Sequence, residues 1–138
     1  MSDNVFLDTN TIIYAYSLSD IGKQSVSSKL LLNNKCIVST QVLNEYCNVC
    51  LKKFSMLVSE VLSDIDNILD NCGLIRVSET TIKRALFIQE RHKYSYYDSL
   101  IIASAMESNC SVLYSEDLQH GQVIDGSLKI MNPYNHFE

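Results

Sequence analysis

The sequence has little that interrupts regular structure, since it contains a single proline among its 138 residues. Together with an apolar fraction of 46%, this composition is typical of a compact fold and excludes a disordered chain. The longest apolar run, Leu100 to Met106, is interrupted by Ser104 and is too short to cross a bilayer. The start, "MSDNVF", has no basic segment followed by an apolar stretch, so no signal peptide is expected. We therefore expect one domain, 1–138, with no membrane segment.

Features of a secreted protein or of a strongly basic nucleic-acid-binding protein are also missing. The five cysteines form an odd set without a secretory context, which predicts reduced, mostly buried thiols and a cytoplasmic protein. Cys47 and Cys50 form a C-x-x-C pair, but no second pair follows, which argues against a zinc site. The net charge of −5 excludes binding of nucleic acid through bulk positive charge. An enzyme that gathers acids in one site remains compatible with it.

Short apolar segments alternate with segments of helical periodicity. Because both types recur along the chain, the pattern predicts an α/β fold with a mainly parallel sheet covered on both faces. Ser39, Ser78 and Ser95 are placed to cap helices, and Cys72-Gly73 to end one. Strands are expected at Val5–Leu7, 36–39, 74–77, 111–115 and 128–131, and helices at 11–17, 23–32, 40–54, 58–71, 78–93 and 95–108.

Four carboxylates fall where a parallel sheet binds its ligands, beyond the carboxyl ends of the strands. Asp8 ends the first strand, Glu45 lies early in the helix after the second, Asp98 opens the apolar helix, and Asp117 follows the fourth strand. Each also has a structural explanation: Asp8 as a helix cap, Asp98 in a capping box with Ser95, Glu45 as a surface residue and Asp117 as a turn former.

Clustered carboxylates raise one another's pKa values and need a cation to neutralise them. A set of ligands made only of oxygen atoms favours Mg²⁺ or Mn²⁺. These metals commonly act on phosphate esters. The pattern therefore indicates a metal-dependent enzyme acting on phosphate esters, if the four acids meet.

Four stretches together resemble the motifs of PIN domains, most closely those of the VapC-type toxin ribonucleases: "FLDTN", "STQVLNE", "YYDSLIIASA" and "YSEDL". The resemblance implies an α/β/α sandwich with a central, mostly parallel sheet. It also implies a Mg²⁺- or Mn²⁺-dependent endoribonuclease that acts as the toxin of a type II toxin–antitoxin system. Such toxins are usually homodimers, cleave RNA and are silenced by a cognate antitoxin protein.

The resemblance also implies roles for individual residues. Asp8 and Asp98 would be the principal metal ligands, with Glu45 and Asp117 completing the catalytic pocket. Asn10 and Ser115 correspond to polar positions that support these acids. The chain departs from the family in having Glu116 before the last aspartate, and we expect Asp117 to face the metal.

Two other functions start from the same residues. A phosphatase of the haloacid dehalogenase type also begins with a strand ending in aspartate, but it requires a second acid where this chain has Asn10. A receiver-like domain requires paired acids earlier in the chain. A PIN-fold binding module without activity is the other alternative, and it would be expected to lack one of the acids.

Two surfaces are expected to contact partners. The basic residues Arg91 and Lys93 would hold phosphates that flank the cleaved bond. Residues 56–70 carry a long apolar stripe, which together with Tyr94, Tyr96 and Tyr97 favours a homodimer.

Overall fold

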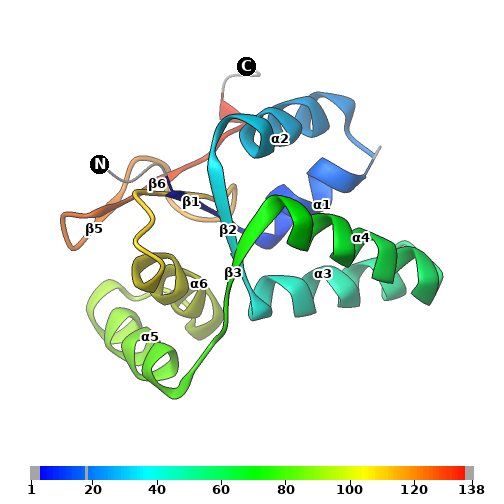
Figure 1. Ribbon diagram of the computed structural model, residues 1–138. Helices are drawn as coiled ribbons and strands as arrows, with labels where there is room; N and C mark the ends of the chain where they lie inside the picture. Colours follow the sequence, from blue (N-terminus) through cyan, green and yellow to red (C-terminus); the bar gives the residue numbers. More distant parts are fainter. Residues whose placement is uncertain (1–3, 18, 136–138) are drawn as a thin grey trace.

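The computed structural model describes residues 4–17 and 19–135, and Figure 1 shows its helices and strands. The strands are β1 (Asn4–Leu7), β2 (Lys35–Ser39), β3 (Cys72–Ile75), β4 (Val112–Tyr114), β5 (Val123–Ile124) and β6 (Leu128–Met131). The helices are α1 (Thr9–Tyr16), α2 (Ile21–Asn33), α3 (Thr40–Lys52), α4 (Val58–Asn71), α5 (Glu79–His92) and α6 (Tyr96–Glu107).

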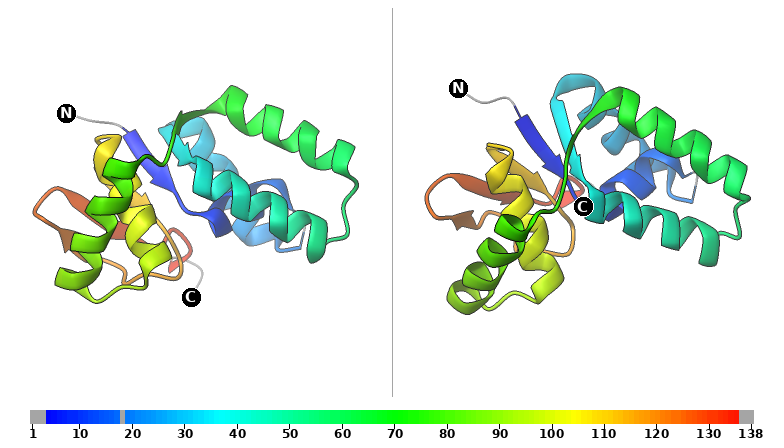
Figure 2. Two further views of the ribbon diagram at one scale, coloured as in Figure 1. Left: turned by 90° about the horizontal axis from the view of Figure 1, so that it is seen from below. Right: turned by 60° about the horizontal axis from the view of Figure 1, so that its bottom comes forward.

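The strands form a single sheet in the order β3-β2-β1-β4-β6-β5. All neighbouring pairs are parallel except β5 with β6, which is antiparallel. Helices α1 to α4 lie to one side of the strands, and α5 and α6 lie to the other, in all three ribbon views (Figures 1 and 2). The predicted α/β/α sandwich with a mostly parallel sheet is therefore confirmed.

The register of the sheet aligns the ends of its central strands. Leu7 of β1 pairs with Tyr114 of β4, so Asp8 and Ser115 follow at the same level of the sheet. The Asp8 N–H donates to the Tyr114 carbonyl oxygen at 3.1 Å, and the Ser115 N–H donates to the Met131 carbonyl oxygen at 3.0 Å. Two polar residues thus emerge side by side at the carboxyl edge.

Burial follows the apolar pattern of the sequence. Phe6 and Leu7 of β1 and Leu113 of β4 are fully buried, as expected for strands covered on both faces. In α6 every residue from Ser99 to Ala105 is buried. The expectation that this helix lies in the interior is confirmed, and its first turn is fixed by the core beneath it.

Helix α4 ends at Asn71 as expected, but the predicted helix stop at Gly73 and the predicted start of β3 at residue 74 were wrong. The chain passes from Asn71 directly into the strand, and Cys72 has an extended backbone (φ −130°), so Gly73 does not cap the helix. Gly73 is needed for another reason: a Cβ atom there would lie 2.8 Å from Ile37 Cδ1 in the neighbouring strand. The Val77 N–H bonds to Thr40 Oγ1 rather than to a strand, which ends the ladder early.

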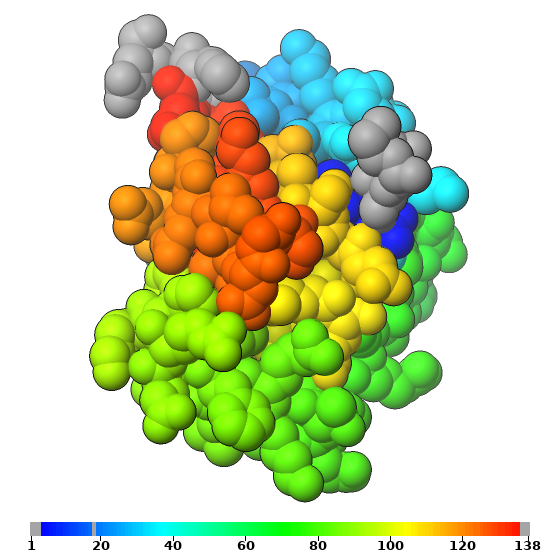
Figure 3. Space-filling view, turned by 90° about the vertical axis from the view of Figure 1, so that its left-hand side faces the viewer, coloured from blue at the N-terminus to red at the C-terminus, as the bar shows by residue number. Residues whose placement is uncertain are grey.

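Strand β5 was missed, because its two residues are too few to show a period. Its signal is the Asp125-Gly126 turn, where both residues have positive φ angles (49° and 72°) and lead the chain back along β6. Figure 3 shows this edge of the sheet, coloured orange, lying over α5 in yellow-green. The Tyr94 hydroxyl and the Gln122 side-chain oxygen are hydrogen-bonded across that contact.

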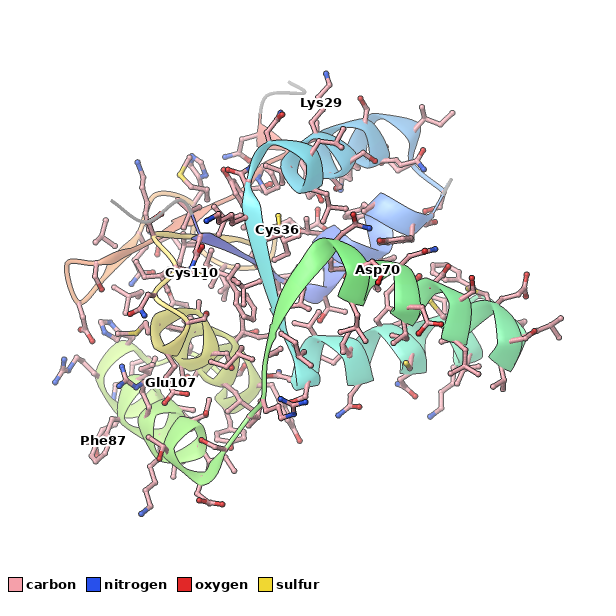
Figure 4. All side chains as sticks on the ribbon, in the orientation of Figure 1. Lys29, Cys36, Asp70, Phe87, Glu107 and Cys110 are labelled. Atoms are coloured by element: carbon pink, nitrogen blue, oxygen red, sulfur yellow. The ribbon has the colours of Figure 1, made fainter. Side chains whose placement is uncertain are left out.

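The five cysteines form no disulfide bond, as the sequence predicted. Cys36, Cys50, Cys72 and Cys110 are buried, Cys47 is half-buried, and all five are unpaired. Figure 4 shows Cys36 and Cys110 at the sheet.

Across residues 4–17 and 19–135, none of the helices combines the length and the apolar character needed to cross a membrane.

Candidate active site

Asp8 is held at the junction of β1 and α1. Its Oδ1 accepts the Thr9 N–H at 2.7 Å, so it does cap α1, while its Oδ2 accepts the Ser115 hydroxyl at 2.8 Å. Only 8% of the residue is exposed. Burial, and then the charges of Glu45 and Asp117, raise the pKa of Asp8 to about 6 against the two hydrogen bonds. The cap and the acid cluster are therefore both real features of this residue.

Glu45, on α3, is held near Asp8 by hydrogen bonds to both of its carboxylate oxygens. The Thr9 hydroxyl donates to Glu45 Oε1, and the Gln41 side-chain amide donates to Glu45 Oε2 at 3.5 Å. Gln41 lies one helical turn before Glu45, which places both on one face of α3. Sequence reasoning missed Thr9 and Gln41 as supporting residues, although the four-residue spacing of Gln41 from Glu45 was a usable signal.

Asp98 and Asp117 complete the cluster. The Asp98 N–H donates to the Ser95 hydroxyl at 3.2 Å, which confirms the predicted cap of α6. Asn10 donates its side-chain amide to Asp117 Oδ2 at 2.8 Å. Burial, followed by the charges of Glu116 and Asp98, raises the pKa of Asp117. The charge of Asp98 therefore reaches Asp117.

Glu116 is held away from this cluster. Lys23 Nζ lies 2.8 Å from Glu116 Oε2, and the Tyr14 hydroxyl donates to Glu116 Oε1 at 2.6 Å. The Lys23 ammonium also lies 4.7 Å from the centre of the Tyr14 ring. Both carboxylate oxygens of Glu116 are therefore engaged, whereas the neighbouring Asp117 faces the acids. Nothing in the sequence indicated that Lys23 would pair with Glu116.

The four carboxylates line one cavity of about 310 Å³, which we call the acid cavity. Asp8 reaches it from β1, Glu45 from α3, Asp98 from α6 and Asp117 from the loop after β4. Four distant chain segments thus deliver like charges to one hollow. Such an arrangement is unfavourable unless a cation or a cationic group neutralises it.

The donor set fits a hard divalent cation. All four acids present oxygen atoms. Burial first, and then the charges of Glu45 and Asp117, raise the pKa of Asp8, and a bound cation would offset both effects. Within the described ranges, no three acidic, histidine or cysteine side chains are drawn tightly enough to form a ready-made metal cage. Three of the carboxylates are instead held by neutral donors: Glu45 by Thr9, Asp117 by Asn10 and Asp8 by Ser115.

The structure does not bring Arg91 or Lys93 to the acid cavity. Arg91 Nη1 lies 3.1 Å from Asp125 Oδ1, at the turn that joins β5 to β6. Lys93 ends α5 in the left-handed conformation (φ 64°) and is exposed. Contacts of either residue with flanking phosphates remain a prediction.

Comparison with known proteins agrees with this fold. An α/β/α domain with acids gathered at the carboxyl ends of its parallel strands is the class that the structure defines. The family model of the PIN domain matches residues 5–124. The chain belongs to the PIN-domain family. No curated protein matches the sequence.

Several solved structures share the fold at low sequence identity. DNA-bound VapBC from Salmonella typhimurium is 16% identical with a TM-score of 0.70, and the match covers 96% of this chain and 99% of that one. A toxin–antitoxin complex from Klebsiella pneumoniae is 18% identical (TM-score 0.69; 94% and 98% covered). VapC20 of Mycobacterium tuberculosis, described as a toxin that cleaves the sarcin–ricin loop, is 16% identical (TM-score 0.67; 80% and 88% covered).

Proposed function

We propose that this protein is a Mg²⁺- or Mn²⁺-dependent endoribonuclease and the toxin of a type II toxin–antitoxin system, acting as a single domain over 1–138. The observation that carries the proposal is the convergence of Asp8, Glu45, Asp98 and Asp117 on one cavity. Membership of the PIN family supports nuclease chemistry. RNA as the substrate is supported by the toxin that is described as cleaving the sarcin–ricin loop.

The two alternatives have less support. A haloacid dehalogenase-type phosphatase needs an acid where this chain has Asn10, and that amide is hydrogen-bonded to Asp117 instead. An inactive binding module has no need to keep four acids at one edge, because their mutual repulsion lowers stability. The presence of all four acids therefore favours an enzyme over an inactive binding module.

The mechanism follows from the positions of the acids. A divalent cation held by Asp8, Asp98, Asp117 and Glu45 would supply an activated water and neutralise charge on the phosphate. Asp8 is fixed by two hydrogen bonds, so its carboxylate is oriented before substrate arrives. Glu45 lines the cavity from α3, and Asp117 lines it from the loop after β4. Either carboxylate can accept the proton that the attacking water loses.

End-group analysis of the cleaved RNA tests this mechanism directly. Attack by water on the phosphodiester does not use the ribose 2′-hydroxyl, so the products should carry a 5′-phosphate and a 3′-hydroxyl. Purified protein with Mg²⁺, and with EDTA as the control, is incubated with total RNA and the ends are mapped. Products with a 2′,3′-cyclic phosphate, or cleavage that persists in EDTA, would contradict the mechanism.

Asp117 and Glu116 are expected to differ sharply despite being adjacent. Asp117→Asn should lower cleavage about 100-fold, since losing even a supporting partner of a metal site costs about 10–100-fold. Glu116→Gln should lower it by less than about fivefold, because it removes only a partly exposed ion pair with Lys23. Initial rates of RNA cleavage, with circular dichroism as a check on folding, measure both. Equal losses in the two variants would place Glu116 in the site.

An antitoxin is the expected protein partner in the cytoplasm. Structures similar to this chain are toxin–antitoxin complexes. The acid cavity would attract an arginine or lysine side chain of the antitoxin, which replaces the charge of the metal. Such a contact would block the cavity and silence the enzyme.

A homodimer is expected to form through the apolar surface of α4. Val61 and Ile68 of this helix are buried, but Leu57, Val58 and Leu62 are at least 60% exposed. Light scattering at micromolar concentration should show a dimer that Leu62→Ser weakens, since it removes an apolar side chain from the interface. Leu32→Ser on α2, where Leu32 is 83% exposed, is the control. A monomeric wild type would refute the prediction.

A further inference from the structure

A second cavity adjoins the acid cavity and differs from it in chemistry. It has a volume of about 440 Å³ and lies between α3 and the first turn of α6. It shares Gln41, Glu45, Asn48 and Tyr97 with the acid cavity, so the two are continuous. We call it the amide cavity, after the side-chain amides of Gln41, Asn44 and Asn48.

Gln41 lines both cavities, and its side-chain oxygen accepts no hydrogen bond from the described residues. Its Nε2 donates to Glu45 Oε2 and, at 3.2 Å, to the Tyr97 carbonyl oxygen, which fixes the direction of the amide. Its Oε1 is buried and has no hydrogen-bond partner within the part of the chain that the structure describes. Only 8% of Gln41 is exposed. A buried carbonyl oxygen without a donor is unfavourable, and it gains a partner if the Gln41 side chain turns this oxygen toward a ligand N–H or O–H group in the cavity.

Tyr97 supplies an aromatic surface at the same cavity. It lies in the first turn of α6 and is 65% exposed. Its own neighbour, Tyr96, meets it at 66° rather than stacked on it. Val77 and Leu100 add an apolar wall. Stacking of a planar, unpaired base on an exposed aromatic ring is a common way in which proteins bind single-stranded RNA.

We propose that the amide cavity binds an unstacked nucleobase of the RNA, next to the phosphate that enters the acid cavity. Tyr97 stacks on the base, while Gln41, Asn44 and Asn48 bond to its polar edge. The described lining includes no lysine or arginine, which favours a neutral base over a phosphate group. The inference rests on the proposed nuclease function, and it makes these residues determinants of sequence preference.

Binding is measured apart from cleavage so that the two proposals are tested separately. Short single-stranded RNAs, each with 2-aminopurine at one position, are titrated with the Asp98→Asn protein, whose binding surface is intact but whose cleavage is suppressed. Stacking on tyrosine should quench the fluorescence at one position. Adding Tyr97→Leu should remove that quenching and weaken affinity about tenfold, the effect of losing one stacked base.

A matched control separates this effect from a general loss of exposed aromatic surface. Phe87 is 71% exposed and points away from α5 at the far side of the molecule (Figure 4), so Phe87→Leu should change neither signal. Tyr97→Leu and Phe87→Leu proteins that behave alike, or RNA that does not bind, would overturn the inference. RNA that binds with this signature but is not cleaved by the wild type would overturn the proposed function alone.

The amides are tested by base preference. In RNAs that vary only at the quenched position, Asn44→Ala should bring the affinities for the four bases closer together, since it removes hydrogen bonds to the base edge. Asn67→Ala, an exposed asparagine on α4, is the control and should leave the preference unchanged. If Asn44→Ala and Asn67→Ala keep the same preference, the amide cavity does not read the base.

Discussion

Replacing Asp98 by Asn is expected to lower RNA cleavage at least about 100-fold while leaving the fold intact. Asp98 lies in the first turn of a buried helix, and its N–H rather than its carboxylate completes the helix cap with Ser95. The substitution therefore keeps the cap and replaces one charged oxygen of the acid cavity with a neutral amide. Loss of an outer-shell partner alone commonly costs 10–100-fold, so loss of a ligand should cost at least that.

Brief expression of the wild type and of Asp98→Asn, followed by mapping of new RNA ends, reports both activity and target. Asp70→Asn is the matched control, because Asp70 is an exposed aspartate on α4 (Figure 4). It should cleave the same sites at the same rate as the wild type. If Asp98→Asn also cleaves normally, the Asp98 carboxylate has no part in cleavage and Asp98 is only a residue of the first turn of α6.

Most of the fold was predictable from the sequence because the strands are central and buried. Buried parallel strands are continuous apolar runs, and serine caps mark where α3, α5 and α6 begin. The predictions were wrong where the packing of neighbouring strands, and not the local sequence pattern, decides the structure. Gly73 looks like a helix stop, but its small size serves the close approach of Ile37. Strand β5 exists only because the Asp125-Gly126 turn places it against β6.

The acids of the site were predictable, but the groups that hold them were not. Asp8 and Asp117 lie at strand ends, which meet at one edge in any parallel sheet. The hydrogen bonds from Thr9 to Glu45 and from Asn10 to Asp117 join residues far apart in the chain. Such pairings depend on how α1 packs beside α3 and the β4 loop. Periodicity within one segment carries no information about them.

Asp8→Asn is expected to stabilise the fold in EDTA, which separates an acid cluster from a simple helix cap. Burial and neighbouring charges raise the pKa of Asp8 from 3.8 to about 6. Between these values the folded state binds more protons than the unfolded state, so stability falls as the pH rises through this window. Above pH 7 the ionised carboxylate is therefore destabilising, and the neutral amide removes that cost.

The net gain is reduced by one lost hydrogen bond. Asn can still accept the Thr9 N–H as a cap, but its amide nitrogen cannot accept the Ser115 hydroxyl that now bonds to Asp8 Oδ2. We expect a net gain of about 1 kcal/mol, or a few degrees in Tm for a domain of this size. The gain should shrink as the pH is lowered from 8 towards 4, where the folded wild-type carboxyl is protonated.

Thermal melts of both proteins in EDTA and in Mg²⁺ complete the test. Mg²⁺ should raise the Tm of the wild type by mass action and that of Asp8→Asn much less, because the variant lacks one of the proposed ligands. A simple cap predicts a different result. Asn caps a helix about as well as Asp, so neither buffer would separate the two proteins. Equal shifts with Mg²⁺ would therefore remove Asp8 from the metal site, and with it the assignment on which the nuclease proposal depends.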